Sequence, residues 1–234
     1  MSGQIPTYDY IIVGAGSAGC VLANRLSEVP ENKVLILEAG RKDRNWLIHI
    51  PMGVAKIWNQ ERFNWSYSSE PEPNLDNRQL YHPRGKVLGG SSSINMMAYV
   101  RGNGADYDRW AQMGLSDWSY EKVLPYFRRA EKFLNGTDVY HGDKGPLHTQ
   151  PLLSQDPLME AYFQAGRDAG FTVTEDFNGA EQEGLARMQF NIGGGRRQSS
   201  SVSFLHPVLH RSNLDLRVKA HVVKIDFENY KAVG

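Results

Sequence analysis

The sequence has a single cysteine, Cys20, and no stretch of about 18 apolar residues that could cross a membrane. One thiol cannot form an internal disulfide, and its position beside Val21 and Leu22 favours core packing over a redox role. The amino end carries no charged and apolar signal segment. These absences predict a soluble, cytoplasmic protein with no integral membrane segment, and they leave peripheral association with the inner membrane as the alternative.

Excess charge of either sign is also lacking, because 26 Lys and Arg residues balance 26 Asp and Glu residues. A neutral chain with interspersed charges offers no electrostatic basis for binding nucleic acid. The sequence contains no G-x-S-x-G elbow, which argues against a serine nucleophile, and no internal repeat. Its 234 residues suffice for one large domain or two small ones.

The most informative segment is an apolar run, Tyr10–Val13, followed by G-x-G-x-x-G at Gly14, Gly16 and Gly19. The run is rich in β-branched residues, which is typical of a strand buried on both faces. Gly14 permits a sharp turn, Gly16 lets a diphosphate approach the backbone, and Gly19 lets the next helix pack closely. That helix, predicted over residues 17–27, directs the N–H groups around Ser17 and Ala18 toward the phosphates.

A second predicted strand, Lys33–Leu37, leads into Glu38 and Ala39. An acid about 20 residues beyond the glycines can accept hydrogen bonds from ribose hydroxyls. The order of strand, helix, strand and acid therefore predicts dinucleotide binding. The plain alternative is a βαβ unit with a glycine turn and no ligand.

Residues 41–100 are rich in tryptophan and proline and show no clear period. We expect a long ordered excursion held by buried aromatic rings, and loops of this length are usually functional. A second glycine-rich turn at Gly89 and Gly90 is followed by Ser91 and Asn95. A flavin dinucleotide benefits from this second backbone approach, whereas a nicotinamide enzyme needs only the first fingerprint. The alternative is a serine-capped helix without a ligand.

The remaining pattern predicts helices at 106–113, 120–134, 157–170 and 200–209, and strands at 145–150, 184–192, 214–218 and 222–227. Turns are predicted at 193–195 and 229–231. On the helix 157–170, the residues at core spacing are Leu158, Tyr162, Ala165 and Ala169. The strand that begins at Ala232 has no room to finish, so we expect a fragment of a longer protein or a partner strand from another chain.

These motifs together resemble the glucose-methanol-choline (GMC) oxidoreductases, flavoproteins that oxidise alcohols. The resemblance covers essentially the whole chain, is most specific over Arg84–Asn95, and extends to choline dehydrogenases and aliphatic alcohol dehydrogenases without selecting a substrate. It implies an α/β fold with a Rossmann-like FAD-binding domain, residues 1–143, and part of an α+β substrate-binding domain, residues 144–197. Residues 198–234 would return, incomplete, to the FAD-binding domain.

The resemblance also assigns the cofactor contacts. It implies FAD, with its diphosphate at the first glycine turn, its adenosine ribose at Glu38 and Ala39, and its adenine against the Val222 backbone. The flavin ring would lie against Gly89, Gly90, Ser91, Asn95, Met96, Met97 and Ala98. Some members link the flavin covalently through a histidine where this chain has Ile94, so we expect non-covalent FAD.

The implied reaction transfers a hydride from a small-molecule alcohol to flavin N5, giving an aldehyde, and the electron acceptor is oxygen or a quinone. The family's histidine base lies in a carboxyl-terminal half that we expect to be missing, so no catalytic residue is assigned and the isolated chain is predicted to be inactive. No metal is predicted, because Pro207 separates His206 from His210 and no third ligand is apparent. The alternatives are an NAD(P)-dependent Rossmann dehydrogenase and a catalytically dead interaction fragment.

Overall fold

The computed structural model describes residues 6–234, and the chain divides into two compact units. Unit 1 combines the segment up to Met96 with Ser199–Gly234, and unit 2 is Met97–Gln198. The sequence placed the first change of domain near residue 144, whereas the structure groups residues 97–143 with the segment that follows them. The assignment of these parts to FAD and substrate stays a prediction.

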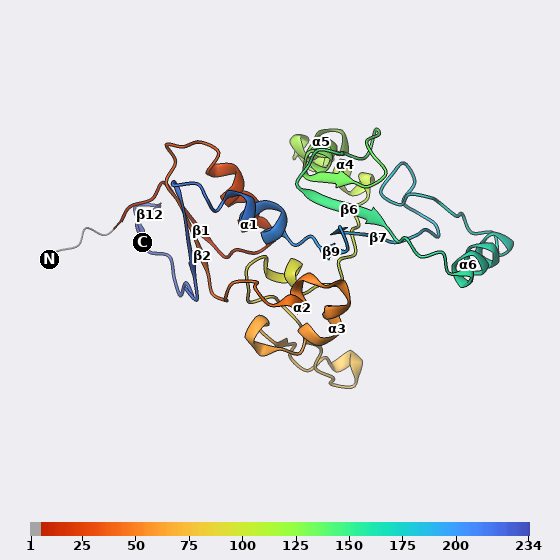
Figure 1. Ribbon diagram of the computed structural model, residues 1–234, viewed down its shortest axis with the longest axis horizontal. Helices are drawn as coiled ribbons and strands as arrows, with labels where there is room; N and C mark the ends of the chain where they lie inside the picture. The colour runs from red at the N-terminus through yellow and green to blue at the C-terminus, as the bar shows by residue number, and fades with distance from the viewer. Residues whose placement is uncertain (1–5) are drawn as a thin grey trace. The chain divides into compact units, whose positions relative to one another are not determined.

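A parallel sheet of three strands lies at the centre of unit 1, in the order β1-β2-β10, and helix α1 packs against β1 and β2 (Figure 1). This arrangement confirms the predicted βαβ unit and the mixed α/β fold. Ile36 in the central strand and Cys20 in the helix are fully buried, and burial raises the pKa of the Cys20 thiol to about 12. The bounds are β1 Tyr10–Val13, α1 Ser17–Leu26, β2 Val34–Glu38 and β10 Leu214–Val218.

The prediction that β1 is buried on both faces is wrong. Ile12 is 7% exposed, but Tyr10, Ile11 and Val13 are 43%, 52% and 53% exposed. Helix α1 covers the face of β1 that carries Ile12, whose side chain lies at Gly19, whereas the opposite face with Ile11 and Val13 stays exposed. Within residues 6–234, β1 also has β2 as its single neighbour and forms one edge of the sheet. The central position, with side chains covered on both faces, belongs to β2 instead.

The excursion after β2 contains short helices that the sequence did not reveal. Its core is a cluster of buried side chains, Ile48, Ile57, Phe63, Val87 and Ile94. The expected aromatic packing is therefore only partly right, because most of this cluster is aliphatic. The elements are α2 Trp46–His49, η1 Pro51–Gly53, α3 Val54–Ile57, η2 Glu61–Phe63, β3 Tyr67–Ser68, η3 Pro73–Leu75, β4 Tyr81–His82 and η4 Gly90–Ser93.

The return segment of unit 1 is helical where the sequence predicts it, as a π-helix followed by a 3₁₀ helix. The predicted turn at 229–231 joins two short antiparallel strands, with Asn229 and Tyr230 at positive φ. The strand predicted at 222–227 is wrong: only its last residue is in a strand. The elements are η6 Ser201–Leu205, η7 His206–Val208, β11 Phe227–Glu228 and β12 Lys231–Ala232.

Unit 2 contains three α-helices, one 3₁₀ helix and two small sheets among the described residues. The predicted helix at 120–134 ends four residues early, because Glu131 begins a strand that pairs in parallel with β6. The elements are α4 Gly104–Gln112, η5 Ser116–Trp118, α5 Tyr120–Ala130, β5 Glu131–Phe133, β6 Leu147–Pro151, α6 Pro157–Asp168, β7 Gln189–Phe190, β8 Ile192–Gly193 and β9 Arg196–Arg197. Across residues 6–234, no helix combines the length and the apolar character needed to cross a bilayer.

Two further predictions for unit 2 need correction. Leu158 and Tyr162 are 74% and 56% exposed, because α6 buries Phe163 and Gly166 instead. The Leu185 side chain lies against Gly166, which places the covered face one residue away from the predicted one. The strand predicted at 184–192 forms only as the short β7 and the first residue of β8. The predicted glycine turn at 193–195 is confirmed, with two glycines at positive φ between β8 and β9.

A buried ionic network holds unit 2 together. Glu131, fully buried, accepts hydrogen bonds from Arg101 and from Nδ1 of His141, at 2.7 and 2.8 Å. Nε2 of His141 lies 2.9 Å from a carboxylate oxygen of Asp176, and the Phe133 ring stacks on the imidazole. Burial alone would lower the pKa of His141, but the hydrogen bonds and charges of Asp176 and Glu131 raise it to about 9. The protonated imidazole thereby balances the second carboxylate.

We expect unit 2 to lose stability as the pH rises from about 6.5 to about 9. The pKa of His141 is higher in the folded state than its ordinary value of 6.5, so its contribution is complete below 6.5 and is lost through about 9. Thermal denaturation across this range measures the loss. The His141→Gln variant should show little of this dependence, and an equal dependence in both proteins would contradict the assignment.

The close packing of α1 on β1 gives a second prediction. A Cβ added to Gly19 would lie 1.9 Å from the Gly14 carbonyl oxygen, whereas a Cβ on Gly16 would meet nothing closer than Gly90 Cα at 4.0 Å. Gly19→Ala should therefore lower the free energy of unfolding by about 1–3 kcal/mol. Gly16→Ala is the matched control and should leave it nearly unchanged in chemical denaturation. Equal losses in the two variants would contradict this packing.

Candidate functional site

The turn between β1 and α1 leaves backbone N–H groups exposed to an opening in unit 1. Gly14 has φ +91°, a conformation that other residues rarely adopt, and its N–H donates to the Leu37 carbonyl at 2.7 Å. Helix α1 begins after Gly16 with no side-chain cap and with no acidic residue in its first turn. The free N–H groups and the positive end of the helix dipole are thus available to an anion.

The second glycine turn packs directly against the first. Gly89 and Gly90 both have positive φ, and the Gly89 N–H donates to the Ala15 carbonyl at 2.7 Å. A Cβ on Gly90 would lie 2.8 Å from Gly16 Cα, so only glycine allows this approach. Two motifs more than 70 residues apart in the sequence therefore form one continuous part of the wall of this opening.

The serines after this turn mostly bind the protein itself. Ser92 Oγ donates to the Gly89 carbonyl at 2.6 Å and lies 2.6 Å from Ser200 Oγ in the return segment. Ser93 Oγ donates to the Leu88 carbonyl at 2.6 Å. Their hydroxyls fix the shape of the turn. Ser91 Oγ accepts a hydrogen bond from a backbone N–H and still lines the opening.

Glu38 braces the first glycine turn from the end of β2. Its two carboxylate oxygens accept hydrogen bonds from the N–H groups of Ala15 and Gly40, at 2.9 and 2.8 Å, and the residue is 5% exposed. A carboxylate oxygen can accept more than one hydrogen bond. The group can therefore hold the turn and still accept from a ribose hydroxyl.

The return segment reaches the end of β2 through two backbone hydrogen bonds. The N–H groups of Lys219 and Ala220 donate to the carbonyls of Gly40 and Glu38, at 2.7 and 2.9 Å. This pairing places residues 220–222 beside the first glycine turn.

Asp43 anchors the helical part of the return segment. Ser201 Oγ donates to the buried Asp43 carboxylate at 2.6 Å, and Nε2 of His206 lies 3.0 Å from it. Burial would raise the pKa of Asp43, but the hydrogen bonds from His206 and Ser201 hold it below its usual range. His206, considered above as one half of a metal pair with His210, thus contacts a carboxylate.

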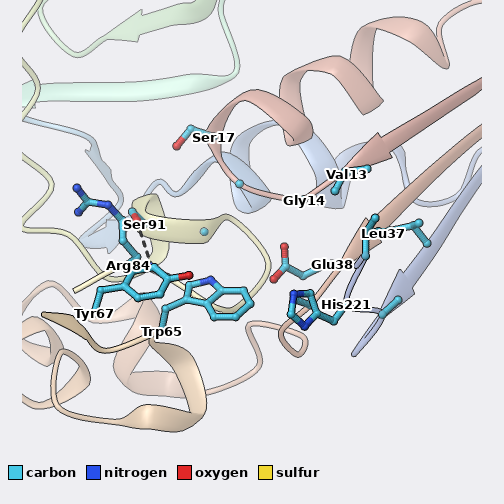
Figure 2. A pocket seen from close by; sticks show the side chains of 16 residues that line it. Val13, Gly14, Ser17, Leu37, Glu38, Trp65, Tyr67, Arg84, Ser91 and His221 are labelled. Atoms are coloured by element: carbon cyan, nitrogen blue, oxygen red, sulfur yellow. Dashed lines mark hydrogen bonds between the residues drawn. The ribbon is translucent and has the colours of Figure 1, made fainter. Parts of the chain in front are cut away.

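These segments enclose a pocket of about 550 Å³ in unit 1. In the view of Figure 2, Glu38 and His221 lie at one end, Arg84 and Ser91 lie at the other, and the Trp65 ring lies between them. The pocket is lined by Val13, Gly14, Gly16, Ser17, Leu37, Glu38, Ala39, Trp65, Tyr67, Arg84, Gly85, Gly90, Ser91, Ala220, His221 and Val222. Its volume lies within the range of small-molecule sites, about 300–1,000 Å³.

The structure brings about half of the predicted cofactor residues together. Those that line the pocket are Gly14, Gly16, Ser17, Glu38, Ala39, Gly90, Ser91 and Val222. Gly19 and Gly89 lie behind it and set the backbone of the two turns. Those that do not line it are Ala18, an exposed residue of α1, and the consecutive residues Asn95, Met96, Met97 and Ala98. Of these four, Met97 has a positive φ of 65°.

Sequence reasoning missed eight of the sixteen residues that line this pocket. They are the larger side chains Trp65, Tyr67, Arg84 and His221, and also Val13, Leu37, Gly85 and Ala220. The Trp65 ring stacks with Tyr67 at 6.0 Å and meets His221 edge to face at 5.4 Å. The density of aromatic residues in the excursion was a signal, but it was interpreted as core packing. No local pattern shows that a ring faces a cavity formed by distant segments.

Replacing Glu38 by Gln should destabilise unit 1 before any ligand is considered. The side-chain amide would place an N–H against the N–H of Ala15 or Gly40, leaving a buried donor without an acceptor. We expect the free energy of unfolding to fall by about 1–3 kcal/mol in urea denaturation. Glu28→Gln, which removes an exposed ion pair with Arg25, is the control and should cost less than about 1 kcal/mol. Similar losses for the two variants would contradict the bracing role.

Comparison with known proteins gives consistent matches along the chain. The family model described as GMC oxidoreductase matches residues 8–234. The mitochondrial choline dehydrogenase of Mus musculus is 46% identical over 234 residues, which cover 97% of this chain and 39% of that enzyme. The alcohol dehydrogenase (acceptor) of Pseudomonas putida is 47% identical over 228 residues, which cover 97% of this chain and 41% of that protein.

A solved structure agrees with these matches. Pyridoxine 4-oxidase from Mesorbium loti superposes with a TM-score of 0.91 at 32% identity, covering 97% of this chain and 45% of that one. The chain spans about two fifths of the length of the sequence relatives that it matches. As the motif Arg84–Asn95 predicts, the chain belongs to the GMC oxidoreductase family.

Proposed function

We propose that this chain forms the FAD-binding part of an enzyme that oxidises a small-molecule alcohol to an aldehyde. The observation that carries the proposal is the direct backbone contact between the two glycine turns, at Ala15 and Gly89. A nicotinamide dehydrogenase needs only the first turn, whereas here both turns line one pocket. The names of the choline and alcohol dehydrogenases among its relatives support the same reaction class.

The residues present suit a dinucleotide. The space in front of Gly16 is open, since a Cβ there would meet only Gly90 Cα at 4.0 Å, and the uncapped start of α1 faces it. We assign the diphosphate to the first glycine turn and the start of α1, at Gly14, Gly16, Ser17, Ala18 and Gly19. The adenosine ribose is assigned to Glu38 and Ala39, and the adenine to Val222. The flavin ring is assigned to Gly89, Gly90, Ser91, Asn95, Met96, Met97 and Ala98.

We propose that FAD is held without a covalent bond. Ile94 stands at the position of the histidine that carries the covalent link in some members of the family, and it is 1% exposed within the aliphatic core of the excursion. An alkyl side chain cannot form such a link. The tightness of binding must then come from the pocket itself.

When bound, the flavin supplies a hydride acceptor; the protein has to orient the alcohol and remove its hydroxyl proton. Among the histidines, all within the described residues, only His221 lines the pocket. It lies beside Trp65 near Glu38, at the adenosine end, so we propose no histidine of this chain as the base. We place the base outside these 234 residues, and we therefore expect the chain alone not to oxidise alcohols. Oxygen and a quinone are the alternative electron acceptors.

Titration of the purified chain with FAD, followed by the quenching of flavin fluorescence, tests the proposal. We expect FAD to bind and NAD to compete weakly. Gly16→Val should weaken FAD binding by more than about tenfold, because the branched side chain occupies the space of the diphosphate, while its melting temperature stays near that of the wild type. Failure of the wild type to bind FAD, or a preference for NAD, would contradict the proposal.

A further inference from the structure

Apart from the His221 imidazole and the Tyr67 phenol, the pocket is lined by one carboxylate side chain, Glu38, and one guanidinium, Arg84. They lie at opposite ends of it in Figure 2. The Glu38 carboxylate is buried and already accepts two backbone hydrogen bonds. Arg84 is exposed and lies on the same side as Ser91. The pocket therefore has a negative end and a positive end.

Hydrogen bonds fix the backbone of Arg84, whereas its guanidinium keeps donors to spare. The Arg84 N–H donates to the Asn64 side chain at 2.7 Å, and its carbonyl accepts from the Trp65 N–H at 2.8 Å. Asn64 is itself 3% exposed. Within residues 6–234, the guanidinium makes one hydrogen bond, to the neighbouring Pro83 carbonyl at 2.9 Å, and no ion pair. Most of its five N–H donors stay available to a ligand.

Lys86, another cation of this segment, is engaged with an aromatic ring. The Lys86 ammonium lies 4.2 Å from the centre of the Trp65 ring and does not line the pocket. The face of an aromatic ring attracts a cation, and this attraction holds the Lys86 ammonium over Trp65. Of the lysine and arginine residues in the described chain, Arg84 is therefore the one that lines this pocket.

We propose that Arg84 is the counter-charge of the cofactor's diphosphate, which rests on the proposed function above. A diphosphate carries two negative charges, and the start of α1 supplies the equivalent of about half a positive charge. Glu38 repels phosphate, so Arg84 is the side chain of the pocket whose charge favours a diphosphate at the first glycine turn. The planar guanidinium can donate two parallel hydrogen bonds to phosphate oxygens, which makes such contacts strong.

Binding of FAD, ADP and adenosine to the Arg84→Met variant tests this assignment. Adenosine shares the adenine and ribose of ADP but has no phosphate. We expect roughly a tenfold to hundredfold loss of affinity for FAD and for ADP, and unchanged affinity for adenosine. The dependence of FAD affinity on salt concentration should also become shallower. Arg84→Lys keeps the positive charge but cannot donate two parallel hydrogen bonds, so it should bind FAD with intermediate affinity.

Arg78→Met is the matched control, because Arg78 is exposed, bonds to the Leu75 carbonyl and does not line the pocket. It should bind all three ligands as the wild type does. Unchanged FAD and ADP binding in Arg84→Met overturns the inference alone. An equal loss for adenosine also overturns it, because Arg84 would then act through the fold. If the wild type binds neither FAD nor ADP, the proposed function fails and the inference fails with it.

Discussion

The hydrogen bond from the Gly89 N–H to the Ala15 carbonyl is the contact on which the site depends. It requires glycine at position 90, because a Cβ there would lie 2.8 Å from Gly16 Cα. Because the two turns belong to segments far apart in the sequence, this contact turns a common βαβ unit into one side of a larger pocket. Each turn alone would present only part of the wall.

The end of β2 completes this arrangement through one buried carboxylate. Glu38 holds the N–H of Ala15 on one side and that of Gly40 on the other, and its own carbonyl accepts from Ala220 in the return segment. Glu38 thus connects strand β2, the first glycine turn and the return segment. A group so constrained costs stability when it is changed, and its position explains how a binding residue can also be a structural one.

Sequence alone predicted the parts of this fold that local patterns encode. The glycines from Gly14 to Gly19 and the acid at Glu38 follow from the steric needs of a turn and a diphosphate, and the structure gathers them in one unit. The exposure of β1 and the buried face of α6 could not be predicted, because strand order and the placement of Leu185 are tertiary facts. Arg84 and Trp65 were missed as pocket residues for the same reason: nothing local indicates that they face the first turn.

Amide hydrogen exchange with and without FAD tests the central claim most directly. If the turns at residues 14–17 and 89–91 are two sides of one cofactor site, FAD should slow exchange at both together. Slowing confined to residues 14–17 would show that the second turn takes no part in binding, and that result would contradict the account.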